Sequence, residues 1–355
     1  MTEETKEWRL IIEGNVEASW GLAVDELLAN FVSKEESAPL LHIYTFLPSV
    51  IVGRYQNMEA AVNLSECRRL GIDYNRRHTG GGTVLMGADQ LALGFAIPLS
   101  HPRMESSMRG SFELLGGTIC RSLRRIGIEA NFQDKNDLKV GGRKIAGMAA
   151  SLEEKQVFFF HMSLLIDFDL PLMLKVLKIS PYKSPERGLS CFSRRITTIR
   201  EQGIKTSFAE IVEIIEQSFA EEFGIKWKER EFTVSQRKKI NDLRKRRYQS
   251  SDWLFRVRSS GTWKVCVERK TPGGLLQVYL TVTRGIIENL LISGDFFSTQ
   301  EEVARMESAL RWTRARKNNV KKVLQEVMED GKTIYRLDAS TLTNIIMEGV
   351  ESCQM

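Results

Sequence analysis

Three consecutive glycines preceded by basic residues form the first segment with chemical potential. It reads Arg76-Arg77-His78-Thr79-Gly80-Gly81-Gly82-Thr83-Val84. Glycines let a backbone approach a ligand closely and point successive N–H groups at an anion, and arginines pair bidentately with phosphate or carboxylate. No Gly-Lys-Ser/Thr follows, so the segment is not a Walker A loop. It does not match the GxGxxG dinucleotide fingerprint either. The segment predicts an anion-binding loop, and a plain glycine hairpin is the alternative.

A second segment, NDLKVGGRKIAGMAA, runs from Asn136 to Ala150. Asp137 is followed seven residues later by Lys144, across a sharp turn at Gly141-Gly142. If two strands flank that turn, Asp137 and Lys144 face one cleft. An ammonium group there neutralises a carboxylate and a phosphate that are brought together, and Asp137 is a candidate ligand for Mg²⁺ on a triphosphate. The alternative is an exposed hairpin with surface charges.

Mixed strands and helices must position these two segments. Apolar periodicity predicts strands at residues 8–13, two within 40–55, 91–98, two around Gly141-Gly142, 156–168, 253–258, 262–269, 275–283 and 286–292. It predicts helices at residues 18–33, 59–70, 106–127, 170–178, 207–223, 300–311, 317–329 and 340–349. The elements do not follow a βαβ rhythm, so the expected class is α+β.

The chain has 355 residues, which predicts about two domains. Its net charge of +6 comes from one stretch, since residues 226–258 hold 12 Lys+Arg against 4 Asp+Glu. This stretch lacks a clear apolar face at its start, so we expect a solvated charged linker there. We place the boundary inside it, with a catalytic domain at 1–234 and an accessory domain at 235–355. The stretch carries no RRM, KH or helix-turn-helix signature, which argues against a nucleic-acid partner.

Composition excludes several other classes of protein. The five cysteines are scattered without a CxxC pair, as in a reduced cytoplasmic protein. The longest apolar run, Leu91 to Leu99, is nine residues, too short to cross a membrane. The acidic N-terminus does not resemble a signal peptide. We therefore expect a cytoplasmic protein with no metal held by His and Cys ligands.

Taken together, the two segments resemble the lipoate–protein ligase family, which shares its catalytic fold with biotin–protein ligases. The resemblance covers nearly the whole chain and includes GLAVDELL in the first helix, IVGRYQN at 51–57, His161 in FFFHMSLL, and SRRITTI at 193–199. LRKRRYQSSDWLFR at 243–256 looks like the opening of the accessory domain of the longer ligases. The resemblance implies mixed sheets flanked by helices, followed by a small α+β accessory domain.

The resemblance also implies roles for individual residues. The segment expected to hold lipoyl-adenylate or ATP comprises Arg77, Thr79, Gly80, Gly81, Gly82, Thr83, Val84 and Leu85. Asn136 and Asp137 match the family's NDL segment near the phosphates, and His161 matches the family's strand histidine. Lys144 matches the lysine that contacts the acyl carbonyl and the phosphate. Gly147 and Ala149 match the small residues beside that lysine.

Two positions depart from the family pattern. The family commonly has His-Asp where this chain has Met86-Gly87, and His-Gly where it has His161-Met162. The spacing between Asp137 and Lys144 is also short. These departures bear on nucleotide geometry and on the choice of acceptor.

The implied reaction has two steps. Lipoate or octanoate attacks the α-phosphate of Mg·ATP to give an acyl-adenylate, and a lysine of a lipoyl carrier protein then displaces AMP. The carrier is a 2-oxoacid dehydrogenase or glycine-cleavage carrier, or a lipoate-binding protein of sulfur metabolism. Carriers of this kind are typically acidic, so the basic stretch would steer them toward the site.

Other functions stay open on the sequence alone. One is an octanoyl or lipoyl transferase of the same fold that uses a cysteine thioester, for which Cys191 is the thiol nearest to the matched motifs. A biotin ligase lacks support, because the GRGRxxR-type loop is missing. The non-enzymatic alternatives are a basic nucleic-acid-binding protein and an inactive acyl-binding protein.

Overall fold

The computed structural model describes residues 7–34, 38–105, 107–133, 136–153, 156–179, 192–256, 263–328 and 334–354. An eight-stranded sheet dominates the first two thirds of the chain, in the order β11-β1-β2-β6-β10-β9-β8-β7. Its strands are β1 (Glu7–Val16), β2 (Leu40–Phe46), β6 (Gln90–Pro98), β7 (Asn131–Gln133), β8 (Asp137–Val140), β9 (Arg143–Glu153), β10 (Val157–Leu165) and β11 (Lys226–Glu229). β1 pairs in parallel with β2 and β11, and the other neighbours are antiparallel. This mixed sheet confirms the expected α+β class.

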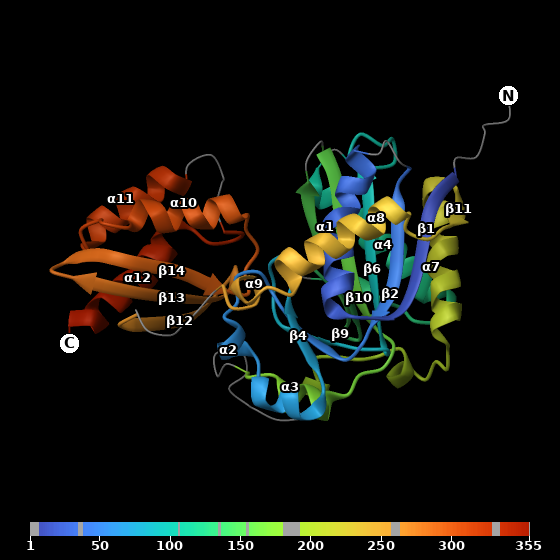
Figure 1. Ribbon diagram of the computed structural model, residues 1–355, viewed down its shortest axis with the longest axis horizontal. Helices are drawn as coiled ribbons and strands as arrows, with labels where there is room; N and C mark the ends of the chain where they lie inside the picture. Colours follow the sequence, from blue (N-terminus) through green and yellow to red (C-terminus); the bar gives the residue numbers. More distant parts are fainter. Residues whose placement is uncertain are drawn as a thin grey trace.

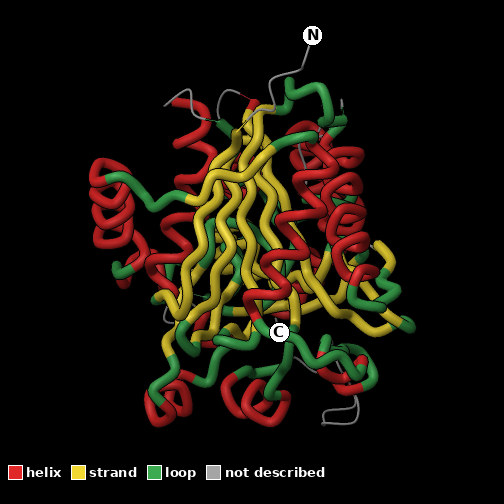
Figure 2. The backbone as a smooth tube through the Cα atoms, turned by 90° about the vertical axis from the view of Figure 1, so that its right-hand side faces the viewer, coloured by secondary structure: helices red, strands yellow, loops and turns green. Residues whose placement is uncertain are grey.

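Helices cover both faces of this sheet (Figure 2). Side chains alternate along β6, where Leu93 and Phe95 enter one core and Ala92 and Ala96 enter the other. The helices α4 (Met108–Arg125) and α7 (Phe208–Phe223) cover the first face, and α1 (Ala18–Lys34) and α8 (Val234–Leu243) cover the second. Both faces of β6 are therefore buried, which explains why its sequence is a continuous apolar run.

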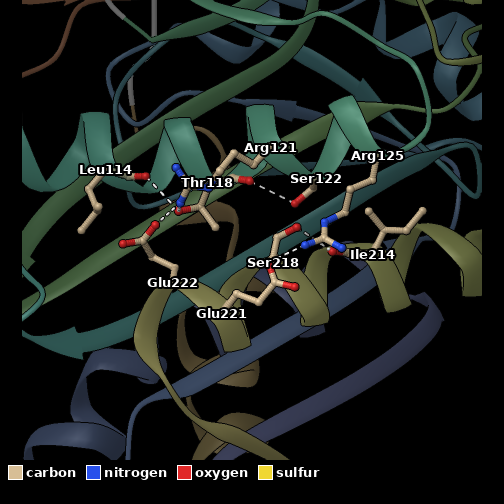
Figure 3. Close-up of polar contacts among 9 residues, drawn as sticks. All are labelled: Leu114, Thr118, Arg121, Ser122, Arg125, Ile214, Ser218, Glu221 and Glu222. Atoms are coloured by element: carbon tan, nitrogen blue, oxygen red, sulfur yellow. Dashed lines mark hydrogen bonds and ion pairs between the residues drawn. The ribbon is translucent and has the colours of Figure 1, made fainter.

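Polar contacts join α4 to α7 at their outer edges (Figure 3). Arg121 pairs with Glu222 and Arg125 pairs with Glu221. Within the helices, hydroxyl groups bond back to carbonyl oxygens, as Ser218 does to Ile214 at 2.9 Å. These partly exposed ion pairs add little stability, so the apolar core between the two helices holds this layer together.

A small second sheet carries the glycine loop. It has the order β4-β3-β5, from β3 (Ser49–Val52), β4 (Asp73–Arg76) and β5 (Val84–Met86). Short helices flank it: α2 (Met58–Ala61), α3 (Leu64–Leu70) and α5 (Leu170–Val176). The predicted helix at 59–70 is thus two helices, interrupted at Val62, which bridges to Leu177.

The basic stretch is not a solvated linker. Residues 234–254 form α8, a π-helical turn η3 (Arg244–Tyr248) and α9 (Ser251–Leu254), so the strand expected at 253–258 is also wrong for its described part. Buried Ile240, Leu243 and Tyr248 join the core under α1, and Arg244 and Arg247 pair with Glu17 and Glu26 on or beside that helix. The domain boundary at 234/235 stays a prediction, and this packing favours a later division, after α9.

The accessory unit is a three-stranded antiparallel sheet with helices on it (Figure 1). Its strands are β12 (Val265–Thr271), β13 (Gly274–Thr283) and β14 (Ile286–Gly294), followed by α10 (Gln300–Leu310), α11 (Lys317–Met328) and α12 (Ala339–Gln354). These elements enclose a second core, which also takes in Tyr55 of the first unit. None of the helices in the described ranges is both long enough and apolar enough to span a membrane.

Candidate active site

The glycine loop is held in shape by its own arginine. The loop joins β4 to β5, and the Arg77 guanidinium donates to the carbonyl oxygens of Gly80 at 2.7 Å and Gly82 at 2.8 Å. Burial lowers the pKa of Arg77 to about 10, so the group stays charged at neutral pH. Its donors are therefore engaged with the loop, and what it offers a bound anion is chiefly its charge.

The Arg76 side chain has a structural role. It is fully buried and donates to the carbonyl oxygens of Gly53, Gln56 and Leu254 at 3.0, 2.6 and 2.8 Å. Burial lowers the pKa of this guanidinium to about 9. The expectation that both arginines bind an anion is wrong for Arg76, because backbone carbonyls occupy its donors.

The accessory unit docks directly on the glycine loop. The Gly81 N–H donates to the Phe296 carbonyl oxygen at 3.1 Å, and a Cβ built on Gly80 would clash with that same oxygen. Gly81 has a φ of +92°, which only glycine adopts without strain. The Tyr55 ring stacks on Phe296 with centroids 4.9 Å apart. Gly80 and Gly81 thus allow the close contact between the two units.

Lys144 is fixed by the strands on either side of it. Its Nζ lies 2.7 Å from Asp137 Oδ1, so the two residues do face one cleft across the β8–β9 hairpin. The backbone of Lys144 is bonded to the SRRITTI segment, with its N–H donating to Arg195 at 2.8 Å and its carbonyl accepting from Thr197 at 2.8 Å. A Cβ on Gly147 would lie 2.7 Å from Nζ. Glycine at position 147 therefore leaves room for the ammonium group.

Two cavities meet at Lys144 and Thr83. The first, of about 200 Å³, is lined mainly by apolar and glycine residues from α1, β2, the glycine loop, β9 and β10. The second, of about 740 Å³, is rich in polar side chains and includes Gln56, Asn57, Asp137, Lys178, Arg195, Glu268, Lys270, Gln277 and Asp295. One cavity suits an apolar chain and the other a charged, polar group, and the lysine stands where they join.

These cavities bring together nearly all of the residues predicted from the sequence. The first cavity is lined by Arg77, Thr79, Gly80, Gly81, Gly82, Thr83, Val84, Asn136, Lys144, Gly147, Ala149 and His161. Asp137 lines the second. Leu85 lines neither, because its side chain is buried with Val50 in the core under the small sheet. The functional roles of these residues stay predictions.

The histidines at this site are neutral. His161 Nε2 lies 3.1 Å from Thr79 Oγ1, and burial lowers the pKa of His161 well below its ordinary value. Burial, with nearby Arg54 adding to it, lowers the pKa of His78 to about 3. A neutral His161 positions the Thr79 hydroxyl and adds no charge to the apolar cavity.

The two methionine departures from the family pattern both fall at the first cavity. Met86 and Met162 line it and are 4% and 3% exposed. Neither lines the polar cavity. The two methionines therefore change the lining of the apolar cavity and not that of the polar one.

Several lining residues were not anticipated from the sequence. Asp25 and Tyr44 line the apolar cavity, and Lys270 and Asp295 of the accessory unit line the polar one. An acid on the apolar face of the first helix was a visible signal for Asp25. The accessory residues left no sequence signal, because they reach the site only through docking of the two units.

No cysteine among the residues that the structure describes lines either cavity. Cys67 and Cys120 are buried in cores, and Cys266 is exposed on the accessory sheet. Cys191 lies outside the described residues, although its neighbour Phe192 lines the polar cavity. The described ranges also contain no group of three or more His, Cys, Asp or Glu side chains placed to hold a metal.

Curated relatives of two kinds match this chain. An octanoyltransferase LipM of Carboxydothermus hydrogenoformans is 26% identical over 269 residues, covering 70% of this chain and 98% of that protein. A lipoate–protein ligase 1 of Staphylococcus aureus is 28% identical over 290 residues, covering 81% of this chain and 84% of that protein.

Solved structures with the same fold include lipoate ligases. LipL1 of P. falciparum, in complex with lipoate, has a TM-score of 0.74 at 16% identity and covers 97% of this chain and 99% of its own. A lipoate–protein ligase A bound with ATP has a TM-score of 0.61 at 23% identity, covering 70% of this chain and 98% of its own. The first comparison spans both units of the chain, so the two-unit fold is shared as well as the catalytic sheet.

Family models match both parts of the chain. The bacterial lipoate protein ligase C-terminus matches residues 263–346, which form the accessory unit. The lipoyl protein ligase A/B catalytic domain matches residues 17–220, more than half of the chain. This protein belongs to the lipoyl protein ligase A/B family.

Proposed function

We propose that this protein is an ATP-dependent lipoate–protein ligase, which activates lipoate or octanoate as an acyl-adenylate and transfers it to a lysine of a lipoyl carrier protein. One observation carries the proposal: an apolar cavity and a larger polar cavity meet at Lys144. The acyl chain would occupy the first cavity and the nucleotide the second. The carboxylate and the α-phosphate would then meet beside the ammonium group.

The reaction needs positioning and charge rather than an enzyme nucleophile. A carboxylate oxygen of the acid attacks the α-phosphorus, and the bond to pyrophosphate breaks. The carrier lysine amine then attacks the acyl carbonyl, the bond to AMP breaks, and the amine loses a proton. Both reactants of the first step are anions, so Lys144 lowers their repulsion where they meet. Phe297, which lines the apolar cavity, helps to exclude water from the adenylate.

Magnesium enters this proposal only as part of the nucleotide. The Asp137 carboxylate is paired with Lys144 at 2.7 Å, and the described part of the chain offers no cluster of three acidic, histidine or cysteine ligands. We therefore derive no step through a protein-held metal. The assignment of Asp137 as a magnesium ligand stays a prediction.

A cysteine-dependent transferase is the second candidate. The octanoyltransferase relative favours it, and so does the position of Phe192 on the polar cavity, next in sequence to Cys191. In that reaction the thiol would take the acyl group from one carrier and pass it to another without ATP.

One assay separates the two candidates. Purified protein is mixed with lipoate and a lipoyl domain, with or without ATP, and the domain is weighed by mass spectrometry. The ligase modifies the domain only when ATP is present, and Cys191→Ser keeps most of that activity. Transfer from an octanoyl carrier without ATP, together with a thioester trapped on the wild-type protein and lost in Cys191→Ser, would establish the transferase.

The basic segment provides a separate test of the carrier. Arg244 and Arg247 are tied to glutamates beside and on α1, whereas Lys245 and Arg246 are exposed. Reversal of the latter two charges should therefore raise the KM for an acidic carrier several-fold at low salt while adenylate formation is unchanged. An equal loss in both steps would point to a structural role for these side chains.

A further inference from the structure

The accessory unit carries a second basic cluster, at the turn between β13 and β14. Residues 311–322 hold six Lys and Arg and no Asp or Glu. Trp312 is 64% exposed there, and Ile286 is 37% exposed. An exposed aromatic ring and an exposed aliphatic side chain among cations mark a candidate interaction surface. We call this surface the distal patch, and its six exposed residues are Arg284, Ile286, Arg311, Trp312, Arg314 and Arg316.

Backbone hydrogen bonds hold the distal patch in place. Three bonds of 2.7 to 2.9 Å tie residues 312–315 to the turn and the first residues of β14. Ile286 pairs with Arg314 across this short ladder, so their side chains stand side by side. Ala315 is buried between exposed Arg314 and Arg316. The segment therefore packs one side against the accessory core and turns its cations outward.

The exposed ring of Trp312 is held in an unfavourable backbone conformation. Trp312 has a φ of +66°, and Arg284 in the neighbouring turn has a φ of +51°. Residues with large side chains seldom adopt this left-handed region, and such strain is often found at functional sites. The Arg311 guanidinium lies over the Trp312 ring, 5.3 Å from its centroid. The ring is thus presented to solvent by an ordered support and with a cation on its face.

The positive charge of the distal patch is not neutralised within the described part of the chain. Arg284, Arg314 and Arg316 form no ion pair with any of the described residues. The acids Glu288 of β14 and Glu307 of α10 are bonded to groups of their own unit, at 2.8 Å in each case. The guanidinium groups therefore repel one another, and an anionic surface would relieve that repulsion.

We propose that the distal patch is a peripheral binding site for an anionic lipid surface. Its cations would lie among the acidic headgroups, and Trp312 and Ile286 would enter the interface between headgroups and acyl chains. Lys and Arg are attracted to anionic leaflets, and tryptophan rings favour the membrane–water interface because they are apolar with one polar group. Both chemistries are present on the one patch.

The shape of the patch favours a broad surface over an extended peptide. Figure 1 shows the β13–β14 turn at the end of the accessory unit that points away from the catalytic sheet. Residues 312–315 already occupy the edge of β14 beside this turn, so a peptide cannot add a strand there. A projecting turn that carries an aromatic ring at its side fits a bilayer surface without a groove.

The distal patch is far from the two cavities. β14 has nine residues, which span roughly 30 Å in an extended strand. Ile286 begins this strand, and Gly294 ends it, where its N–H donates to the Tyr55 carbonyl oxygen at 3.0 Å. A lipid surface bound at the turn would therefore leave both cavities open. The inference goes beyond the proposed function and does not rest on it.

The test is co-sedimentation of the full chain with lipid vesicles. One set of vesicles is pure phosphatidylcholine, and the other contains about 30% phosphatidylserine. We expect binding to the anionic vesicles only, and weaker binding as the salt concentration rises. Brominated phosphatidylcholine mixed into the anionic vesicles should quench the fluorescence of bound wild-type protein, and this quenching should be lost in Trp312→Phe with added Ile286→Ser only in proportion to the protein released.

Variants of exposed residues test the patch itself. Arg314→Glu combined with Arg316→Glu should weaken vesicle binding at least about tenfold, because each basic residue beside an anionic leaflet contributes about fivefold. Trp312→Ala should weaken it about fivefold or more through loss of the ring. The matched control is Lys226→Glu combined with Arg230→Glu, which makes the same change in net charge at exposed positions of the first unit. This control should bind nearly as wild type does.

Three results would overturn the inference. The first is binding that does not distinguish neutral from anionic vesicles, or no binding to either. The second is an equal loss in the control variant, which would assign the attraction to net charge instead of the patch. The third is preferential binding of oligothymidylate or polyglutamate over anionic vesicles, lost in Trp312→Ala, which would assign the patch to a nucleic acid or to an acidic protein. Circular dichroism of each variant checks that the chain is folded.

Discussion

The two cavities that meet at Lys144 differ in which parts of the chain build them. The apolar cavity is walled by the large sheet, α1 and the glycine loop, and within the described ranges the accessory unit adds only Phe297. The polar cavity takes walls from both units, including Lys270, Gln277 and Asp295 of the accessory unit. The apolar cavity is thus formed almost wholly by the first unit, whereas the polar cavity is complete only while the two units are docked.

Contacts centred on Tyr55 and the glycine loop hold the docked arrangement. Besides the Gly81 bond, Ser293 donates to the Tyr55 carbonyl at 2.7 Å and the Tyr55 hydroxyl donates to Ser298 at 2.9 Å. The stacked rings of Tyr55 and Phe296 add apolar contact. Nucleotide binding should therefore respond to changes at Tyr55 and Phe296 that leave acyl binding intact.

The largest expected effect is at the junction of the cavities. Lys144→Ala removes the charge that lowers repulsion between the two reacting anions, so lipoyl-adenylate formation should fall by at least about 10²–10³-fold. Pyrophosphate release measures this step, and circular dichroism checks folding. Arg143→Ala is the matched control, because Arg143 is on the same strand but pairs with Glu201 at the surface. Wild-type pyrophosphate release from Lys144→Ala would refute the role assigned to the lysine.

The second prediction concerns the docking of the two units, on which the polar cavity depends more than the apolar one. Phe296→Ala removes the ring that stacks on Tyr55, so adenylate formation should fall about tenfold or more, with a raised KM for ATP. Lipoate affinity by calorimetry should change little, because the apolar cavity does not depend on that ring.

The control for that experiment is Met306→Ala. Met306 is fully buried in the same accessory core, so its truncation has a comparable cost in stability, of order 2–5 kcal/mol, but leaves the Phe296 ring on Tyr55 in place. Equal losses of ATP affinity in both variants would mean that accessory stability, and not docking, controls the polar cavity.

The contrast between the cavities also explains which parts of the site could be predicted from the sequence and which could not. Asp137 and Lys144 were expected to face one cleft because a glycine turn between two strands is a local pattern, and their ion pair follows from it. The SRRITTI segment was matched only by resemblance, and its bonds to the Lys144 backbone explain its presence. Local hairpin geometry therefore made the Asp137–Lys144 part of the site predictable from the sequence.

The rest depended on contacts between distant segments. Tyr55 bonds to Ser298 across 243 positions, and no periodicity encodes that pairing. The fold of residues 234–254 was missed because Ile240 and Leu243 are sparse apolar positions among many charges. Their burial comes from packing under α1, which charge counting does not show.

The third effect concerns the apolar cavity and its buried acid. The pKa of Asp25 is about 7 in the folded protein, against about 3.9 in an unfolded chain. Below pH 4 both states are protonated. Between pH 4 and 7 only the folded state holds the proton, so stability falls as pH rises, and above pH 7 it levels off. The Asp25→Asn variant does not titrate, so its free energy of unfolding should exceed that of wild type by an amount that grows from pH 4 to 7.

Urea titrations of wild type and Asp25→Asn at several pH values measure that difference. At about 1.4 kcal/mol for each unit of pKa difference, the change across the window is at most of order 4 kcal/mol. Tyr44→Phe keeps the carboxyl group but removes the hydroxyl that bonds to it, so its pH dependence should persist and extend to higher pH. A difference that does not vary with pH would show that Asp25 is ionised throughout this range.

The smallest effect tests the accessory wall of the polar cavity. Lys270 on β12 lines that cavity and is exposed, so its charge acts on a bound nucleotide through solvent and is partly screened. Lys270→Ala should raise the KM for ATP about two- to fivefold at low salt, less at high salt, and leave the KM for lipoate unchanged. Lys264→Ala, on the same unit but away from the cavity, is the control. A change in the lipoate KM alone would reverse the assignment of the two cavities, since the accessory unit would then serve the acyl chain.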